Sequence, residues 1–256
     1  MQLEFRFCGA MRVAALYDIH GNLPALESVL EELEGVSVDH IVVGGDVLGG
    51  PLQVECLERL AALSSPVHYL MGNSDREVIA ARHGNEHQKL PPFALEILRW
   101  SACRLKPRHE RWIASWPKTL RLEVPRLGSV LFCHATPRDD EEIFTRSTDE
   151  ARLLPIFAAA QAEVVICGHT HMQFDRMVGN TRVVNSGSVG MPFGRPGAEW
   201  LLLQPQVELR HTNYNREEAA RRIAATGFPN APGFDMLNPP PAEQMLALYK
   251  TAELKG

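Results

Sequence analysis

A chain of 256 residues, 45% of them hydrophobic and 22% charged, has the composition of an ordinary globular protein and can bury a sizeable core without disulfide bonds. A formal net charge of -5 argues against an extended nucleic-acid-binding surface, which needs clustered Lys and Arg. No apolar run reaches the ~18 residues needed to cross a bilayer, and the first ten residues lack the apolar core of a secretory signal, so no membrane partner is expected.

The first half of the chain alternates short apolar runs with helical patterns. Leucines recur at helical spacing between positions 23 and 33, after Asn22, whose side chain suits a helix N-cap. A second helical pattern covers 54–63. Strands are expected at 12–17, 40–45 and 66–72. This alternation predicts βαβ units and a parallel sheet, in which functional residues gather at the carboxyl ends of the strands.

The second half has a different pattern. Residues 75 to 116 are expected to be mainly helical, with breaks at 91–92 and at Pro107. Beyond them come short β-prone segments separated by small turns such as Gly179-Asn180, with one helix near 149–160. Strands are expected at 119–124, 129–135, 163–168, 174–178, 181–187, 199–204 and 206–211. These segments predict a mostly antiparallel or mixed sheet.

The two ends of the chain have simpler features. Residues 1–10 are expected to be a loose extension, and a proline-rich linker at 238–243 precedes a short final helix. We expect residues 238–256 to form a C-terminal arm packed on the body, and residues 1–256 to form a single domain. The five cysteines include no CxxC pair, so we expect free thiols in a reducing cytoplasm. Cys133 and Cys167 are expected to be core thiols.

Five polar clusters stand where apolar runs end. Each is a weak signal by itself, because glycine beside an acid is usually a turn. Among their side chains are two Asp, one Asn and four His of metal-ligand type at what should be one edge of the fold, which chance does not readily explain. The clusters are Asp18-Ile19-His20-Gly21-Asn22, Gly44-Gly45-Asp46, Gly72-Asn73-Ser74-Asp75, Cys133-His134-Ala135 and Gly168-His169-Thr170-His171.

This mixture of side chains suits metal chemistry. Imidazole binds zinc, iron, nickel and manganese, whereas carboxylate and amide oxygens favour harder ions, so the set predicts a hydrolytic centre with two divalent ions. Residues i and i+2 of an extended segment point to one side, which groups Asp18 with His20 and His169 with His171. The glycines would keep side-chain bulk away from the ions.

The five motifs, in this order, resemble those of the calcineurin-like metallophosphoesterases: D-x-H, G-D, G-N-H-[DE], a single H, and G-H-x-H. They run from Asp18 to His171. The flanking stretches DIHGNLPALESVL and VVNSGSVGMP resemble the small bacterial phosphodiesterase branch of that family. The resemblance implies an α/β fold, a four-layer sandwich of two mixed β-sheets flanked by α-helices, with two metals at the loop edge.

The resemblance also implies a role for each motif residue. Asp46, Asn73 and His134 would take part in catalysis, in which a water between two ions attacks phosphorus in line. Manganese is the favoured metal, with iron, zinc and nickel as alternatives. The ligands of the first metal would be Asp18, His20 and His171, those of the second would be Asn73, His134 and His169, and Asp46 would bridge the two ions.

Ser74 departs from the family pattern, which often has a histidine there to protonate the leaving oxygen. A serine hydroxyl is a far weaker acid, so substrates with basic leaving groups are expected to react slowly. Asp75 is expected to be a helix N-cap or to orient a histidine. His83, His87 and His109 are alternative sources of the proton.

Five side chains are candidates for contact with the substrate. Asn22 could reach a phosphate, and Ser74 could offer a hydrogen bond. Arg138 and Arg195 flank the expected active-edge loops, as does Arg76, and a guanidinium suits phosphate oxygens. A solvated surface arginine is nevertheless the simpler explanation for each of them. The Gly- and Pro-rich loop at 188–197 could shape the pocket.

Three functions remain open from the sequence. The first is hydrolysis of a small phosphodiester, such as a cyclic nucleotide or another nucleotide derivative. The second is a phosphomonoesterase, including a protein phosphatase, or a dinucleoside polyphosphate hydrolase. The third is a non-catalytic scaffold, as in the retromer subunit with this fold; the intact ligand set argues against it, and Ser74 argues mildly for it. A homo-oligomer also remains open.

Overall fold

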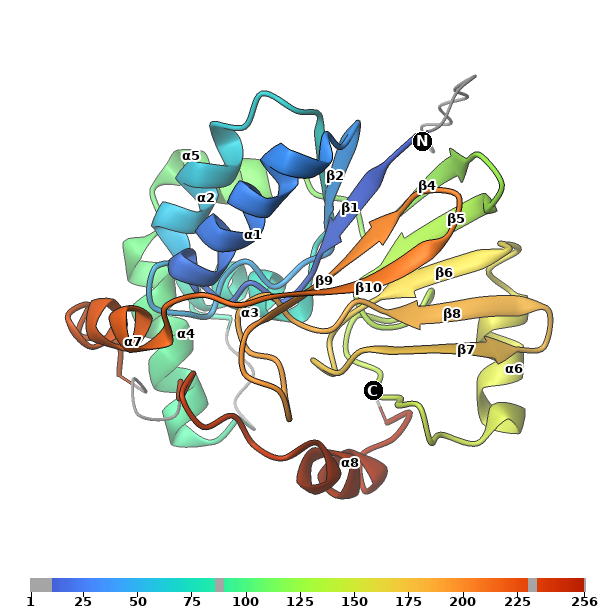
Figure 1. Ribbon diagram of the computed structural model, residues 1–256. Helices are drawn as coiled ribbons and strands as arrows, with labels where there is room; N and C mark the ends of the chain where they lie inside the picture. Colours follow the sequence, from blue (N-terminus) through green and yellow to red (C-terminus); the bar gives the residue numbers. More distant parts are fainter. Residues whose placement is uncertain (1–10, 86–89, 230–233, 256) are drawn as a thin grey trace.

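The computed structural model describes residues 11–85, 90–229 and 234–255 (Figure 1). The expected extension at 1–10 and His87 therefore lie outside the described residues. Two five-stranded sheets pack face to face, and helices cover their outer faces. This is the four-layer sandwich expected from the sequence.

The first sheet has the strand order β10-β9-β1-β2-β3. Its centre is parallel: β1 pairs with β2 from Val13↔His40 to Leu16↔Val43, and β2 pairs with β3 in the same direction. The connecting helices α1 and α2 make this the predicted βαβ unit. The elements are β1 (Val13–Leu16), α1 (Leu23–Val36), β2 (His40–Val43), α2 (Gln53–Ala61) and β3 (Val67–Tyr69).

The second sheet has the strand order β4-β5-β6-β8-β7. Its three inner strands are parallel, and the two outer strands are antiparallel to their neighbours. The strands are β4 (Thr119–Val124), β5 (Gly128–Cys133), β6 (Val164–Cys167), β7 (Phe174–Val178) and β8 (Thr181–Asn185).

The last two strands of the chain, β9 (Ala198–Leu203) and β10 (Val207–Thr212), do not join the second sheet. They return to the first sheet, where β9 pairs antiparallel with β1. The alternation of side chains along a strand predicts a strand but not its partner. For this reason the sequence could not divide the strands of the second half between the two sheets.

Helices occupy the stretch of sequence between β3 and β4, as expected, and part of the C-terminal region. α3 (Asn73–Arg82), α4 (Pro92–Arg104) and α5 (Pro107–Ile113) occupy the predicted helical stretch, and α6 (Glu150–Ala158) and α8 (Ala242–Lys250) are the other expected helices. The patterns do not predict α7 (Arg216–Ala224), of which only Ala219 and Ile223 are buried. The predicted N-cap of α1 is confirmed, because the side chain of Asn22 accepts a hydrogen bond from the Ala25 amide at 3.2 Å.

Each sheet buries both of its faces, which explains the continuous apolar runs in the sequence. Along β1, Ala14 and Leu16 pack against the helices, whereas Val13 and Ala15 face the second sheet. Another core lies between the second sheet and α6; it contains Cys133 and Cys167, as expected. Among the described residues, no helix is long and apolar enough to cross a membrane.

Candidate metal centre

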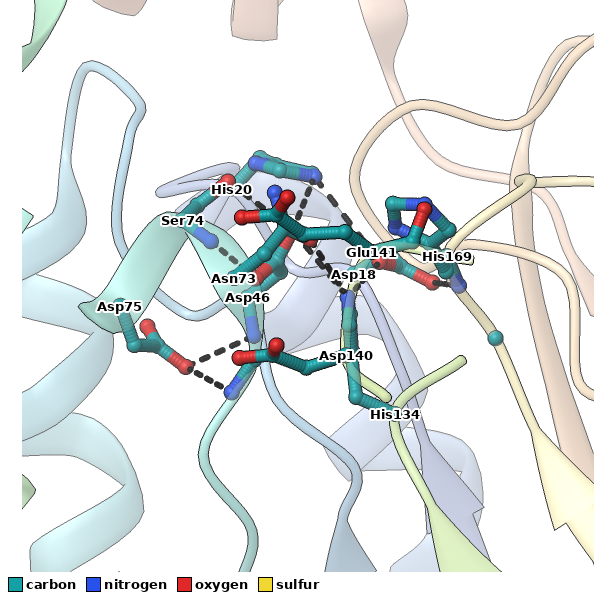
Figure 2. Close-up of polar contacts among 12 residues, drawn as sticks. Asp18, His20, Asp46, Asn73, Ser74, Asp75, His134, Asp140, Glu141 and His169 are labelled. Carbon is teal, nitrogen blue, oxygen red and sulfur yellow. Dashed lines mark hydrogen bonds and ion pairs between the residues drawn. The ribbon is translucent and has the colours of Figure 1, made fainter. Parts of the chain in front are cut away.

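The five strand-end motifs meet at one edge of the sandwich, where buried carboxylates and imidazoles face one another (Figure 2). Asp18 Oδ1 lies 3.4 Å from the Nε2 atom of His171, 3.9 Å from that of His134 and 4.0 Å from that of His20. Asp46 Oδ2 lies 3.5 Å from His134 Nε2 and 3.6 Å from His20 Nε2. Two acids and three histidines therefore surround one small volume.

The donor atoms around this volume fit divalent cations. Asp18 Oδ1 is buried and has no hydrogen-bond partner, although burying such an oxygen without a partner is costly. Two groups have ligand atoms within 4.8 Å of one another, and they share Asp18: Asp18, His20 and His171, and Asp18, Asp46 and His134. A cation at each group would satisfy the free carboxylate oxygen.

The three histidines are held with their Nε2 atoms toward the centre. In each ring, Nδ1 lies within hydrogen-bond distance of a backbone carbonyl oxygen, which places the proton on Nδ1 and leaves the lone pair on Nε2. The distances are 2.9 Å from His134 to Gly44, 2.9 Å from His171 to Met191 and 3.2 Å from His20 to Leu48. The backbone thus prepares the rings as ligands.

The backbone at the centre is not extended, so the argument from residues i and i+2 was wrong in its premise. Five of the nine non-glycine residues with positive φ among the described residues are predicted ligands. Such conformations are unfavourable for most side chains and gather at functional sites. These residues are Asp18 (φ 53°), His20 (φ 44°), Asp46 (φ 54°), His169 (φ 67°) and His171 (φ 56°).

Ser74 holds the carboxylate of Asp46. Its backbone amide donates to Asp46 Oδ1 at 2.8 Å, and its hydroxyl donates to Asp46 Oδ2 at 2.9 Å. The amide oxygen of Asn73 lies 3.0 Å from His134 Nε2, beside the group that contains Asp46. A Cβ atom at Gly72 would lie 2.2 Å from Asp46 Oδ1, so only glycine permits this close approach.

Asp75 has a different role from either of those expected. The N-cap of α3 is Gly72, and no histidine among the described residues forms a hydrogen bond with the Asp75 carboxylate. Instead this buried side chain accepts the amides of Asp46 at 2.8 Å, Leu48 at 2.9 Å and Gly72 at 3.1 Å (Figure 2). One sequence signal could have indicated this role of Asp75. In the spacing Gly72-x-x-Asp75, an acid follows an N-cap by three residues.

His169 stands apart from both groups of donor atoms. Its Nε2 lies 3.1 Å from the carbonyl oxygen of Glu141, while its backbone amide donates to Asp18 Oδ2 at 2.8 Å. Burial, together with His134, lowers the pKa of His169 to about 4, so this ring is neutral. The structure therefore places His169 beside the centre rather than among its converging ligand atoms.

His134 lies close to both acids of the centre. Burial opposes its charge, but Asp46 and Asp18 together raise the pKa of His134 to about 10. Without a cation, a proton on this ring balances part of the carboxylate charge. Because a metal ligand must be deprotonated, cation binding here is expected to release that proton.

Most of the candidate substrate contacts are occupied by other partners. The Asn22 amide group donates to the carbonyl oxygen of Gly190 at 2.8 Å and to the Tyr214 hydroxyl at 3.0 Å, and the side chain is fully buried. Arg138 forms an ion pair with Glu142 at 2.5 Å. Arg195 is exposed and does not line the cleft beside the centre.

The remaining candidates lie near acidic side chains. The guanidinium of Arg76 pairs with Asp140 at 2.8 Å and also with Glu141. His83 and His109 form bonds to Glu110 and Glu58, and neither lines the cleft. The loop at 188–197 does help to shape the site, since Met191 lines the cleft and Phe193 stacks on the ring of His171 with centroids 5.1 Å apart.

Comparison with known proteins identifies the family. The profile of the calcineurin-like phosphoesterase superfamily domain matches residues 11–206. The protein MJ0912 of Methanocaldococcus jannaschii, for which no function is stated, is 24% identical over 240 residues, which is 85% of this chain and 93% of that protein. The phosphodiesterase YfcE of Escherichia coli is 28% identical over 206 residues, which is 77% of this chain and 89% of YfcE.

A solved structure has the same fold. The metallophosphoesterase from Sphaerobacter thermophilus superposes on this chain with a TM-score of 0.71 at 23% sequence identity. The superposition covers 89% of this chain and 98% of the Sphaerobacter chain. The predicted resemblance to small bacterial enzymes of this family is confirmed. The chain belongs to the calcineurin-like phosphoesterase superfamily and is a metallophosphoesterase, a hydrolase of phosphoester bonds.

Proposed function

We propose that the protein hydrolyses phosphodiesters at a centre of two divalent metals bridged by Asp46. The observation that carries this proposal is the position of the Asp46 carboxylate, whose Oδ2 lies within 3.6 Å of His134 in its own group and of His20 in the other group. The first metal would take Asp18, His20 and His171. The second would take Asn73 and His134, and also His169 if its Nε2 turned from the Glu141 carbonyl oxygen to the ion.

The residues of the chain would prepare the centre before substrate arrives. Two bound divalent ions supply activation of a water molecule and positive charge for the phosphoryl oxygens. Asp46 is fixed by Ser74 through two hydrogen bonds, and its loop is fixed by Asp75. Backbone carbonyls orient His20, His134 and His171. Little reorganisation would then be needed during the reaction, which is how preorganised sites lower a barrier.

The leaving group would depart without a proton from Ser74. Its hydroxyl hydrogen is directed to Asp46 Oδ2, and a serine hydroxyl is in any case a weak acid. Diesters with acidic leaving alcohols would suit this site best. Asp75 cannot replace the acid, because its carboxylate is buried against three backbone amides.

Two observations favour a diester over a monoester. Among the described residues, the cleft beside the centre is lined by no Lys or Arg that could bind the second negative charge of a monoester. The relative YfcE is named a phosphodiesterase. The buried acids and histidines that fit cations argue against a scaffold role, since such a role needs no ligands.

The finer assignments are part of the same proposal. Manganese is favoured because the site mixes imidazole with carboxylate and amide oxygen, and iron, zinc and nickel remain alternatives. A cytoplasmic location is supported by the free thiols of Cys56, Cys103, Cys133 and Cys167. One domain with a packed C-terminal arm is supported by hydrogen bonds of 2.9 Å from Gly194 to Pro240 and from Leu254 to Ile143.

The test is turnover by metal-stripped protein reloaded with manganese, iron, zinc or nickel, one at a time. We expect metal-stimulated hydrolysis of bis(4-nitrophenyl) phosphate that exceeds hydrolysis of 4-nitrophenyl phosphate. A preference for the monoester would support the phosphomonoesterase alternative instead. Absence of turnover with every metal would support a scaffold. The Asp46→Asn variant is the control for contaminating phosphatases.

A further inference from the structure

A cleft of about 300 Å³ opens directly from the candidate metal centre. One side carries polar and ligand residues, among them His20, Asp46 and Ser74. Much of the remaining lining is apolar, so an organic group attached to the phosphorus would meet carbon rather than water. The apolar lining consists of Ala94, Ile97, Leu98, Met191, Phe228 and Phe234.

Glu77 is the one acid of the cleft lining that belongs to neither group of donor atoms. It lies on α3, three residues after Ser74, and residues at this spacing share a helix face. Within the described part of the chain, its carboxylate has no hydrogen-bond or ion-pair partner. Burial and the nearby Glu141 raise the pKa of Glu77. A partly buried carboxylate that has no direct partner is stabilised by a cation that binds beside it.

Arg76 opposes the rise in the pKa of Glu77 but does not cancel it. Arg76 is already paired with Asp140 and Glu141, and Arg138 is paired with Glu142. Each guanidinium is therefore matched or exceeded by carboxylates. No Lys or Arg stands in the described lining of the cleft to balance Glu77, and a substrate with additional negative charge beside it would be repelled at short range.

We propose that Glu77 is a specificity-determining residue that selects phosphodiesters whose organic group is apolar and carries a cationic amine. The inference rests on the proposed function, because it assumes that the phosphodiester lies at the metal centre. The apolar wall would hold the carbon part of the group, and Glu77 would pair with the ammonium. Substrates with a second anionic group, such as dinucleoside polyphosphates, would bind poorly.

The test uses symmetric diaryl phosphates, because the same group then occupies the cleft whichever ester bond breaks. Three diesters are compared: diphenyl phosphate, and its analogues with a 4-aminomethyl or a 4-carboxymethyl group on each ring. The measurement is kcat/KM for the manganese-loaded protein, from chromatography of the released phenol. We expect kcat/KM to be roughly tenfold higher for the aminomethyl diester, whose ammonium would lie beside Glu77, than for the carboxymethyl diester.

The Glu77→Gln variant should lose most of this ratio while it still hydrolyses diphenyl phosphate. Glu31→Gln, an exposed change on α1, alters the net charge equally and should keep the wild-type ratio. Equal kcat/KM for the ammonium and carboxylate diesters in the wild type would overturn the inference. So would a ratio that persists in Glu77→Gln.

Calorimetric binding of the same diesters to the manganese-loaded protein separates the two proposals. Binding with the expected preference for the ammonium diester but without hydrolysis would support the role of Glu77 and contradict the proposed function. Hydrolysis of all three diesters without preference would leave the proposed function standing and refute the role of Glu77.

Discussion

Asp75→Asn is the most informative single substitution, because it changes one atom outside the proposed ligand set. The Asp75 carboxylate accepts three backbone amides, two of them from the loop that carries Asp46. An amide group has only one acceptor oxygen, so its NH₂ would face at least one amide N–H. A buried donor without a partner costs about 1–3 kcal/mol, and the remaining bonds lose their charge assistance.

The hydrogen bonding lost amounts to about 3 kcal/mol in the free energy of unfolding. Because Asp75 supports the loop of a proposed ligand, metal affinity should also fall by roughly 10–100-fold. Burial and Asp46 raise the pKa of Asp75 to about 7, so above that pH the ionised carboxylate carries a cost that the neutral amide removes. The net loss should therefore be larger about one pH unit below this value than one unit above it, and unfolding is measured at both.

The assays are urea unfolding of the metal-free protein and calorimetric titration with manganese. Asp39→Asn is the matched control, since the exposed Asp39 accepts the Arg12 amide at 2.7 Å at the opposite end of the strands. The control should change the free energy of unfolding by less than about 0.5 kcal/mol. If Asp75→Asn behaved like this control in both assays, the argument for a loop held by Asp75 would be refuted.

Three further predictions follow from the centre and its surroundings. Asp46→Asn should abolish diester hydrolysis with much less effect on the fold, because an amide balances the charge of two ions poorly; turnover at saturating metal tests this. Wild-type kcat/KM should depend steeply on leaving-group pKa across aryl and alkyl phosphoesters, since general acid catalysis typically contributes ~10²–10⁴-fold, and Ser74→His should flatten the dependence. A shallow dependence in the wild type would mean that another residue supplies the proton. Burial raises the pKa of Glu199 to about 8, and its Oε2 has no hydrogen-bond partner. This group favours the folded state at low pH and loses that contribution as pH rises through the folded pKa, so Glu199→Gln should raise the free energy of unfolding by about 1–3 kcal/mol above pH ~8 and little near pH ~4. Unfolding curves at both pH values check it, with the more exposed Glu208→Gln as the control.

The sequence was informative about the site because polar residues interrupted apolar runs. A strand buried on both faces has a continuous apolar sequence. Asp18, Asp46 and His134 were therefore conspicuous, because each follows the end of such a strand. Parallel strands then bring such ends to one edge. This reasoning needs no side-chain geometry, and it predicted which motifs would meet.

The details of the site depended on geometry that residue types do not specify. Positive φ at Asp18 and Asp46 could not be read from an acid beside an apolar run. The inward direction of Asp75 was equally hidden, because an acid in the first turn of a helix more often faces solvent. The pairing of Arg138 with Glu142 was accessible, since the two lie four residues apart in an acidic stretch.

The fold, like the site, has parts that the sequence predicts and parts that depend on contacts between distant residues. Periodic apolar residues predicted α1, whereas α7 buries only two side chains and its strongest signal is the N-cap Asn215, which accepts the Glu218 amide at 3.0 Å. Without a wide apolar face, such a helix depends on its packing against the body. The return of β9 to the first sheet likewise depended on long-range pairing.

The most direct test of the central claim is a crystal structure of manganese-loaded protein together with elemental analysis of the same preparation. The proposed centre predicts two ions per chain, with the Asp46 carboxylate bound to both. A single ion that does not contact Asp46 would contradict it.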